Sequence, residues 1–354
     1  MRLITLEKRL TPMPGAFFLV PAVAILLALL AGACFIALAG KSPLEVYQAM
    51  LGGAFGSAFG LAETTVKAIP LALCALGVSL AFRMQLWNIG AEGQFYMGAM
   101  AATWVALNFP DGSRWQLLPA MLVLAWLAGG LWALLPAIPK ALWQVNETIT
   151  TLMLNYVAIL WVDYLVFGPW KDPKGFNFPL TATFGPGATL PTLGNTRIHA
   201  GFLLALLAAV LIYLIFRYTT WGFQLKVVGE SRAAARYAGM SITKTILLTM
   251  FFSGALAGIA GMAEVAGITQ RLQQGLSPGY GYSAIIIAWL ARLHPFAILL
   301  VAFLFGGLLS GGYALQTLGL PAASVYMLQG LILFFVLGGE IFINYRLRIG
   351  GKKA

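Results

Sequence analysis

The sequence places side chains that can hydrogen-bond a polar solute inside an otherwise apolar stretch. Residues 87–94 read Trp-Asn-Ile-Gly-Ala-Glu-Gly-Gln, so two amides and a carboxyl group lie close together in the chain. Such groups are costly within a bilayer unless they pair with one another or line a cavity, and glycines allow a helix to break and expose its backbone. The segment therefore indicates either a solute pathway or a structural hydrogen-bond network that joins neighbouring helices.

Polar and aromatic residues in later apolar stretches extend this set. The candidates for solute contact are Trp87, Asn88, Glu92, Gln94, Tyr96, Asn155, Tyr156 and Glu264. Amides, hydroxyls and aromatic rings suit a neutral, hydroxyl-rich solute better than fixed charges do. Residues 146–151 (Asn-Glu-Thr-Ile-Thr-Thr) open the stretch that contains Asn155. They fit either a helix cap with its first turn or one wall of a polar cavity.

Ionisable residues within apolar stretches leave a second chemistry open. Glu92, Asp163 and Glu264 could relay protons in a secondary transporter. Asp163 is more typical of a hydrogen bond between helices, and Lys67 lies near a span end, from which its side chain can reach the membrane surface. Uptake that needs a proton gradient rather than ATP would favour this alternative.

Catalytic and metal-binding signatures are missing from the sequence. It contains no metalloprotease HExxH, no Walker A glycine loop and no nucleophile elbow. Its two cysteines, Cys34 and Cys74, both lie in apolar runs, so we predict neither a metal site nor a disulfide. The sequence therefore predicts a protein without catalytic residues of its own. An intramembrane enzyme and a passive channel remain weaker alternatives.

Composition defines the environment of these residues. Of the 354 residues, 60% are hydrophobic and 9% are charged, against about 25% charged in ordinary soluble proteins. A soluble chain of this length could not cover its surface with so few charges. The sequence therefore predicts an all-α, polytopic integral membrane protein, because apolar runs near 20 residues indicate helices.

About ten membrane spans are expected, with one or two of them broken or re-entrant. They cover roughly residues 16–39, 65–82, 86–108, 116–138, 148–168, 199–217, 245–267, 283–293, 295–314 and 322–343. The third is interrupted by glycine, and the eighth is too short to cross a bilayer alone. Gly254 and Gly258 form a GxxxG pair, which predicts close contact between helices. The whole chain, 1–354, is expected to form a single transmembrane domain.

The basic residues predict orientation. The net charge is +11, yet no basic stripe interleaved with aromatics suggests nucleic-acid binding. With both termini in the cytoplasm, a majority of the Lys and Arg residues, including Arg2, Arg9, Lys352 and Lys353, fall on the inner side. We therefore predict an N-in, C-in protein in contact with the lipid bilayer.

Two connecting segments are long enough to have functions of their own. The outer loop 169–198 is rich in Pro and Gly, and Lys171, Asp172 and Lys174 could dock an external partner or simply be solvated. The inner loop 218–244 contains a short helix over 229–240, in which Glu230 lies near the start and Gly239 caps the end. Pattern alone favours a basic helix at the lipid headgroups over a helix that docks on a cytoplasmic protein.

The order of these motifs resembles a known family. The motifs are Asn88 to Gln94, Asn146 to Ile149, Gly229-Glu230 with Ala234 to Met240, and the small-residue stretch from Ser253 to Gly261. Together, over residues 60–340, they resemble permease subunits of bacterial ABC importers in the branched-chain amino acid, ribose and simple-sugar group, most closely the nucleoside-type permeases. Relatives often carry Asn-Pro after the Gly-Glu pair, whereas this chain has Ser231-Arg232.

The resemblance implies a division of labour in the bacterial inner membrane. Separate cytoplasmic subunits would bind ATP and Mg, a second permease (identical or different) would complete the pathway, and a periplasmic or lipoprotein binding protein would deliver a nucleoside or simple sugar. It also implies that the inner helix couples to the ATPase, which reverses the preference for a lipid-bound helix. The coupling residues would be Gly229, Glu230, Arg232, Ala234, Ala235, Arg236, Tyr237 and Gly239.

Overall fold

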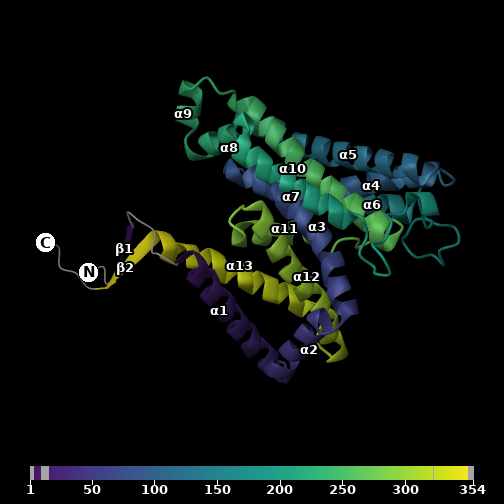
Figure 1. The fold of residues 1–354 in the computed structure, drawn as a ribbon, viewed down its shortest axis with the longest axis horizontal. Helices are drawn as coiled ribbons and strands as arrows, with labels where there is room; N and C mark the ends of the chain where they lie inside the picture. The colour runs from purple at the N-terminus through teal and green to yellow at the C-terminus, as the bar shows by residue number, and fades with distance from the viewer. Residues whose placement is uncertain (1–3, 9–15, 322, 350–354) are drawn as a thin grey trace. The chain divides into compact units, whose positions relative to one another are not determined.

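The computed structural model describes residues 4–8, 16–321 and 323–349 and is almost entirely helical (Figure 1). The exceptions are two short strands, β1 (Ile4–Lys8) and β2 (Tyr345–Ile349), which pair antiparallel with Ile4 opposite Ile349. The all-α prediction is therefore confirmed for the body of the chain but missed this ribbon. Residues 345–349 read Tyr-Arg-Leu-Arg-Ile, and such alternation of apolar and polar residues is typical of a strand.

Thirteen α-helices are present in the described residues. They are α1 (Ala16–Leu38), α2 (Pro43–Phe55), α3 (Ala58–Arg83), α4 (Ala91–Asn108), α5 (Arg114–Trp143), α6 (Glu147–Phe167), α7 (Gly201–Tyr218), α8 (Thr220–Glu230), α9 (Arg232–Tyr237), α10 (Ile242–Glu264), α11 (Tyr280–Leu290), α12 (Pro295–Thr317) and α13 (Ala323–Asn344). A 3₁₀ turn, η1 (Pro186–Ala188), lies between α6 and α7, and a π-helical turn, η2 (Val265–Thr269), extends α10.

Each of the ten apolar segments expected from the sequence overlaps one of these helices. Seven described helices, α1, α3, α5, α6, α7, α10 with η2, and α12, are long and apolar enough to cross a membrane. The chain before α4 is irregular up to Gly90, and α11 has only 11 residues, as the broken third and short eighth segments indicated. The total of ten spans and the N-in, C-in orientation stay predictions, and Arg2, Arg9, Lys352 and Lys353 lie outside the described residues.

One compact unit, Ala58–Gly307, contains the motifs singled out in the sequence. Its centre is α10, which packs along α3, α4 and α5. Glycines make this approach close: a Cβ on Gly258 would lie 2.2 Å from the carbonyl oxygen of Ala125, and one on Gly98 would lie 2.3 Å from Gly258 Cα. The close packing predicted from Gly254 and Gly258 is confirmed, because only glycine lets the two backbones touch.

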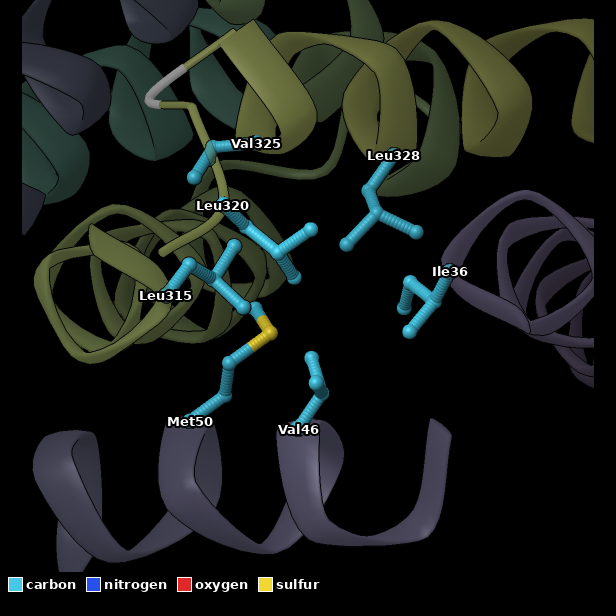
Figure 2. Packing of buried hydrophobic residues seen from close by; sticks show 7 residues of the cluster. All are labelled: Ile36, Val46, Met50, Leu315, Leu320, Val325 and Leu328. Carbon is cyan, nitrogen blue, oxygen red and sulfur yellow. The ribbon is translucent and has the colours of Figure 1, made fainter. Parts of the chain in front are cut away.

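The other compact unit combines the described residues up to Ser57 with those from Leu308 onward. Apolar side chains from α1, α2, α12, α13 and the connection between α12 and α13 meet in one cluster, shown in Figure 2: Ile36, Val46, Met50, Leu315, Leu320, Val325 and Leu328. The sequence analysis missed α2, which is too short for a span. Its start was nevertheless encoded, because Ser42 caps it and Pro43 occupies its first turn.

Within the 58–307 unit, the two long connecting segments lie at opposite ends of the helix bundle. Figure 1 shows α8 and α9 at one end, whereas the 168–200 loop lies at the other, between the end of α6 and the start of α7. This separation is what a bundle crossing a membrane requires if one segment faces the cytoplasm and the other the outside.

Candidate functional site

Asn88 forms the centre of a buried amide network. Its Nδ2 donates to Gln94 Oε1 at 3.0 Å, and Gln94 Nε2 donates back to Asn88 Oδ1 at 3.0 Å. Asn88 Nδ2 also donates to Ser253 Oγ on α10 at 2.9 Å, while the Gly90 N–H donates to Asn88 Oδ1. The network thus holds the irregular segment before α4 against α10.

Asn155 connects α6 to the same segment. Its Oδ1 accepts from the Gly93 N–H at 2.8 Å, and its Nδ2 donates to the Ile89 carbonyl at 2.9 Å and to the Tyr282 hydroxyl at 3.2 Å. The first N–H groups of a helix have no partner within that helix. Asn155 satisfies one of these donors of α4 from a different helix, which fixes α4, α6 and α11 relative to one another.

Glu92 and Tyr96 bring α11 into contact with α4. The Gly281 N–H donates to Glu92 Oε2 at 2.7 Å, and the Ser277 N–H donates to the Tyr96 hydroxyl at 3.3 Å. A Cβ on Gly281 would lie 2.2 Å from the Glu92 backbone nitrogen. The carboxylate thus accepts from the first turn of α11, where the helix dipole favours negative charge.

The geometry divides the predicted pathway residues into two groups. Asn88, Glu92, Gln94, Tyr96 and Asn155 are all buried and bonded to neighbouring helices. Within this chain they form the structural network that the sequence left open as an alternative to a pathway.

Trp87 and Tyr156, by contrast, are exposed. The Trp87 ring packs against the rings of Phe82 and Trp289 at a tilt, with ring centroids 5.1 and 5.8 Å away. The Tyr156 side chain is 55% exposed. These two residues, and not the buried amides, are the members of the predicted set that the fold leaves free to meet another molecule.

Glu264 lies in a separate buried charged cluster. Its Oε1 is 3.7 Å from Lys67 Nζ, and Lys67 Nζ lies 3.1 Å from the Tyr280 hydroxyl. The sequence allowed the Lys67 side chain to reach the membrane surface; instead it points inward, because a buried carboxylate needs a cationic partner. The π-helical turn η2 begins immediately after Glu264, and such turns are frequent at functional sites.

The segment 146–151 is a helix cap followed by its first turn. Asn146 Oδ1 accepts from the Thr148 N–H at 2.9 Å, and Thr151 Oγ1 bonds back to the Glu147 carbonyl. Glu147 pairs with Lys140 at 2.7 Å. The cap therefore joins the end of α5 to the start of α6, and its polar groups are occupied by the protein itself.

The predicted coupling helix has different boundaries from those expected. Gly229 and Glu230 end α8, whereas α9 begins at Arg232, because Ser231 adopts an extended backbone and accepts from the Ala234 N–H at 3.2 Å. Glu230 therefore lies at the end of a helix and does not favour the start of α9. Gly239, at φ +73°, follows α9 as predicted, and left-handed backbone of this kind suits glycine.

Side chains on α9 face in opposite directions. Ala235 is fully buried, whereas Tyr237 is 97% exposed. Arg232 Nη1 donates to Gln144 Oε1 at 3.0 Å, which ties α9 to the end of α5. The Arg232 bond thus anchors α9 to the bundle, while the Tyr237 side chain projects outward.

The predicted docking residues lie in a folded loop. The Asp172 N–H donates to the Leu180 carbonyl at 2.9 Å, Asp172 Oδ1 accepts from the Lys174 N–H, and Lys171 bonds to Asn177. The loop is tied to the segment after α10 by a bridge between Leu180 and Gln273. Its exposed tip includes Phe176 and Phe178, which are adjacent to the predicted charges.

Among the described residues, no group of three or more His, Cys, Asp or Glu side chains is arranged to hold a metal ion. His199, directly before α7, is buried, and this burial lowers the pKa of its imidazole to about 4. Its Nδ1 accepts from the Gly201 N–H at 3.2 Å, so the ring is neutral and has a structural role.

Residues 274–282 contribute to the site, although no sequence motif had singled them out. Ser277, Tyr280 and Tyr282 bond to Tyr96, Lys67 and Asn155, respectively, and the Gln274 side chain hydrogen-bonds to Asp163. A cluster of hydroxyls and amides between Thr269 and the short apolar helix was the available signal. Nothing in the sequence, however, indicated that this segment returns to α4 and α6.

Comparison with known proteins agrees with this architecture. Residues 60–337 match the family model described as branched-chain amino acid transport system, permease component. The chain is 38% identical to the glucose ABC transporter permease protein TsgB13 of Haloferax volcanii, over 98% of this chain and 94% of that protein. It is 37% identical to the guanosine ABC transporter permease protein NupP of Bacillus subtilis (90% and 92%). It is 31% identical to the nucleoside ABC transporter permease protein NupB of Lactococcus lactis (90% of each chain).

Proposed function

This chain belongs to the family of branched-chain amino acid transport system permease components, and from that premise we propose that it forms half of the membrane pathway of an ATP-driven importer. The single observation that carries the proposal is α9. A short helix at one end of the bundle, anchored through Arg232 and presenting a fully exposed Tyr237, suits docking in a groove of another protein.

The solute is a nucleoside or a simple sugar. The three relatives are named for glucose, guanosine and nucleosides, and these molecules share a ring that carries several hydroxyl groups. Polar side chains that can exchange hydrogen bonds with hydroxyls also reach the surface of the 58–307 unit, among them Tyr156 and Gln274. A neutral, hydroxyl-rich solute therefore fits this chain better than an ion does.

Each partner has a corresponding surface on the chain. Separate cytoplasmic subunits, which bind ATP and Mg, engage α8 and α9. An external binding protein engages the 169–198 loop through Lys171, Asp172 and Lys174, beside the exposed Phe176 and Phe178. A second permease subunit completes the pathway, and the assembly resides in the bacterial cytoplasmic membrane with the α9 end facing inward.

The buried network gives this arrangement a mechanism. Asn88 and Asn155 join α4, α6, α10 and α11 through direct hydrogen bonds, so these helices move together when α9 is displaced. Closure of the ATPase pair then reorients the whole group in one step. The pathway opens alternately to the two sides, and the network transmits the motion because it holds the helices rigid.

The test is uptake by the purified complex in vesicles. We expect accumulation of guanosine or glucose that requires the binding protein and ATP and persists when a protonophore collapses the proton gradient. Accumulation without ATP that the protonophore abolishes would overturn the proposal in favour of a proton-coupled transporter. Flux with neither energy source would indicate a passive channel.

A further inference from the structure

Four polar residues on the surface of the 58–307 unit lie together without having been assigned as a group. Tyr156 and Asp163 come from α6, Gln274 from the segment before α11, and Tyr282 from α11. We call them the α6–α11 strip. Tyr156 and Asp163 are seven residues apart, which is two helical turns and places them on one face of α6.

The contacts within the strip show that its polar groups converge. The Gln274 side chain hydrogen-bonds to the Asp163 carboxylate. The Tyr282 hydroxyl lies within electrostatic reach of Tyr156, and the Tyr96 hydroxyl behind the strip lies within reach of both Asp163 and Tyr282. Asn155 donates to the Tyr282 hydroxyl at 3.2 Å. The buried network thus supports the strip from behind.

The strip also retains unused hydrogen-bonding capacity. Asp163 Oδ1 is buried in this conformation and has no hydrogen-bond partner among the described residues, although a carboxylate oxygen accepts up to two. Tyr156 and Gln274 are exposed, and Asp163 and Tyr282 are half-buried. These groups belong to helices of a membrane protein, where a carboxylate facing lipid is costly. A polar molecule facing the strip would supply the partner that Asp163 Oδ1 lacks.

The chemistry of the strip suits a ring that carries adjacent hydroxyls. A carboxylate can accept hydrogen bonds from two neighbouring hydroxyls at once. In dinucleotide-binding folds, an acidic residue hydrogen-bonds to the ribose hydroxyl in this way. The exposed Tyr156 ring offers a flat apolar surface for a base or for the C–H face of a sugar. Gln274, held by Asp163, can donate to a ring oxygen.

We propose that the α6–α11 strip is the solute-contacting surface of the pathway and that Asp163 selects for a vicinal diol, as found in ribonucleosides and hexoses. This rests on the proposed function, because the strip meets solute only in an assembled importer. Asn88, Gln94 and Asn155 then position the strip without touching the solute themselves.

The decisive experiment compares Asp163→Asn with the unmodified chain in the purified complex with ATPase and binding protein. The readout is the ratio of maximal uptake of guanosine to that of 2′-deoxyguanosine, or of glucose to 2-deoxyglucose if the complex carries the sugar. Since both chains receive solute from the same binding protein, a change in this ratio reports on the permease. Asp111→Asn, in an exposed loop, is the matched control.

We expect Asp163→Asn to lower the ratio by roughly tenfold, as loss of a charged hydrogen bond implies, and Asp111→Asn to leave it unchanged. An unaltered ratio with full ATP-driven uptake would overturn the assignment of Asp163 while leaving the importer intact. If the unmodified complex accumulates neither solute with ATP, the proposed function itself fails, so the two failures are distinguishable.

A second measurement distinguishes solute from protein as the occupant of the strip. Tyr156→Cys, in a chain whose Cys34 and Cys74 are replaced by Ala, should react with a charged thiol reagent in the assembled complex, and saturating guanosine or glucose should protect it. Leu207→Cys, on the exposed apolar face of α7, should not react. Reaction in the isolated chain that is lost on assembly, with no effect of solute, would show that the second permease covers the strip and would refute the proposal.

Discussion

Asn155 on α6 accepts a hydrogen bond from the backbone N–H of Gly93 in the first turn of α4, with 2.8 Å between the two atoms. The Asn155 side chain thereby pairs an N–H donor at the start of a different helix, which would otherwise lack a partner. The same amide reaches the Ile89 carbonyl and the Tyr282 hydroxyl. Its removal should therefore loosen three segments at once.

Replacing Asn155 with Leu should destabilise the fold. The change leaves the Gly93 N–H and the Ile89 carbonyl buried without partners, and each such group costs about 1–3 kcal/mol. We expect a lower midpoint in thermal unfolding of the detergent-solubilised protein. Asn108→Leu is the matched control, because Asn108 is exposed and bonds only within its own helix; an equal effect of the two changes would contradict the structural role of Asn155.

Gly258 should tolerate no side chain. A Cβ at this position would lie 2.2 Å from a backbone oxygen of α5, so Gly258→Ala must push α5 and α10 apart at a cost of about 1–3 kcal/mol or more.

Gly330 in α13 offers the matched comparison, since a Cβ there meets nothing within 4 Å. Gly330→Ala should stabilise the helix by up to about 1 kcal/mol. Unfolding midpoints that shift in opposite directions would support the close approach at α10, and a neutral Gly258→Ala would argue against it.

Stability should depend on pH through His199. Burial lowers the pKa of its imidazole to about 4 in the folded chain, from 6.5 in the absence of burial. Between these values the unfolded chain binds more protons, so stability is full above pH 6.5 and falls by up to about 3 kcal/mol as the pH drops toward 4. Protonation of Nδ1 would also remove the bond from the Gly201 N–H.

Unfolding of His199→Gln measured between pH 7 and pH 4 checks this expectation. The variant should lose that part of the pH dependence, whereas His294→Gln, at an exposed position, should keep it. Identical pH profiles for the unmodified chain and His199→Gln would rule out a buried neutral histidine.

The exposed side chains of α9 should matter for energy coupling and not for folding. Tyr237→Ala, and Arg232→Glu combined with Arg236→Glu, should reduce ATP-driven uptake at least tenfold, because an aromatic anchor at a protein interface typically contributes 2 kcal/mol or more. Membrane insertion and unfolding should be unchanged in Tyr237→Ala, since Tyr237 is 97% exposed, whereas the double Arg change also removes the bond from Arg232 to Gln144 that anchors α9. Tyr218→Ala, an exposed tyrosine at the end of α7, should leave uptake intact; equal losses in the two Tyr variants would remove the special role of α9.

The sequence allowed part of the site to be predicted because some signals are local. Asn88 and Gln94 are six residues apart around two glycines, and their pairing follows from the cost of unpaired amides in a bilayer. The close contacts of α10 were likewise predictable from the four-residue spacing of Gly254 and Gly258. Such features need no knowledge of which helices are neighbours.

The rest of the site depends on tertiary contacts. Lys67 pairs with Glu264, which lies far from it in the chain. Tyr282 reaches Asn155 only because the chain turns back toward α4 and α6 after η2. No local pattern specifies those meetings. The start of α9 is different, because Ser231 is a favourable N-cap residue and encodes it locally.

The central proposal is that a separate ATPase binds this chain at α9. The most direct test is to place a photo-cross-linking amino acid at position 237 in cells that express the whole assembly and to identify the protein attached. The account predicts a cross-link to a cytoplasmic ATP-binding subunit, which disappears when the probe is moved to position 176 in the opposite loop. A cross-link from position 237 to an external binding protein, or labelling of that position from outside the cell, would contradict it.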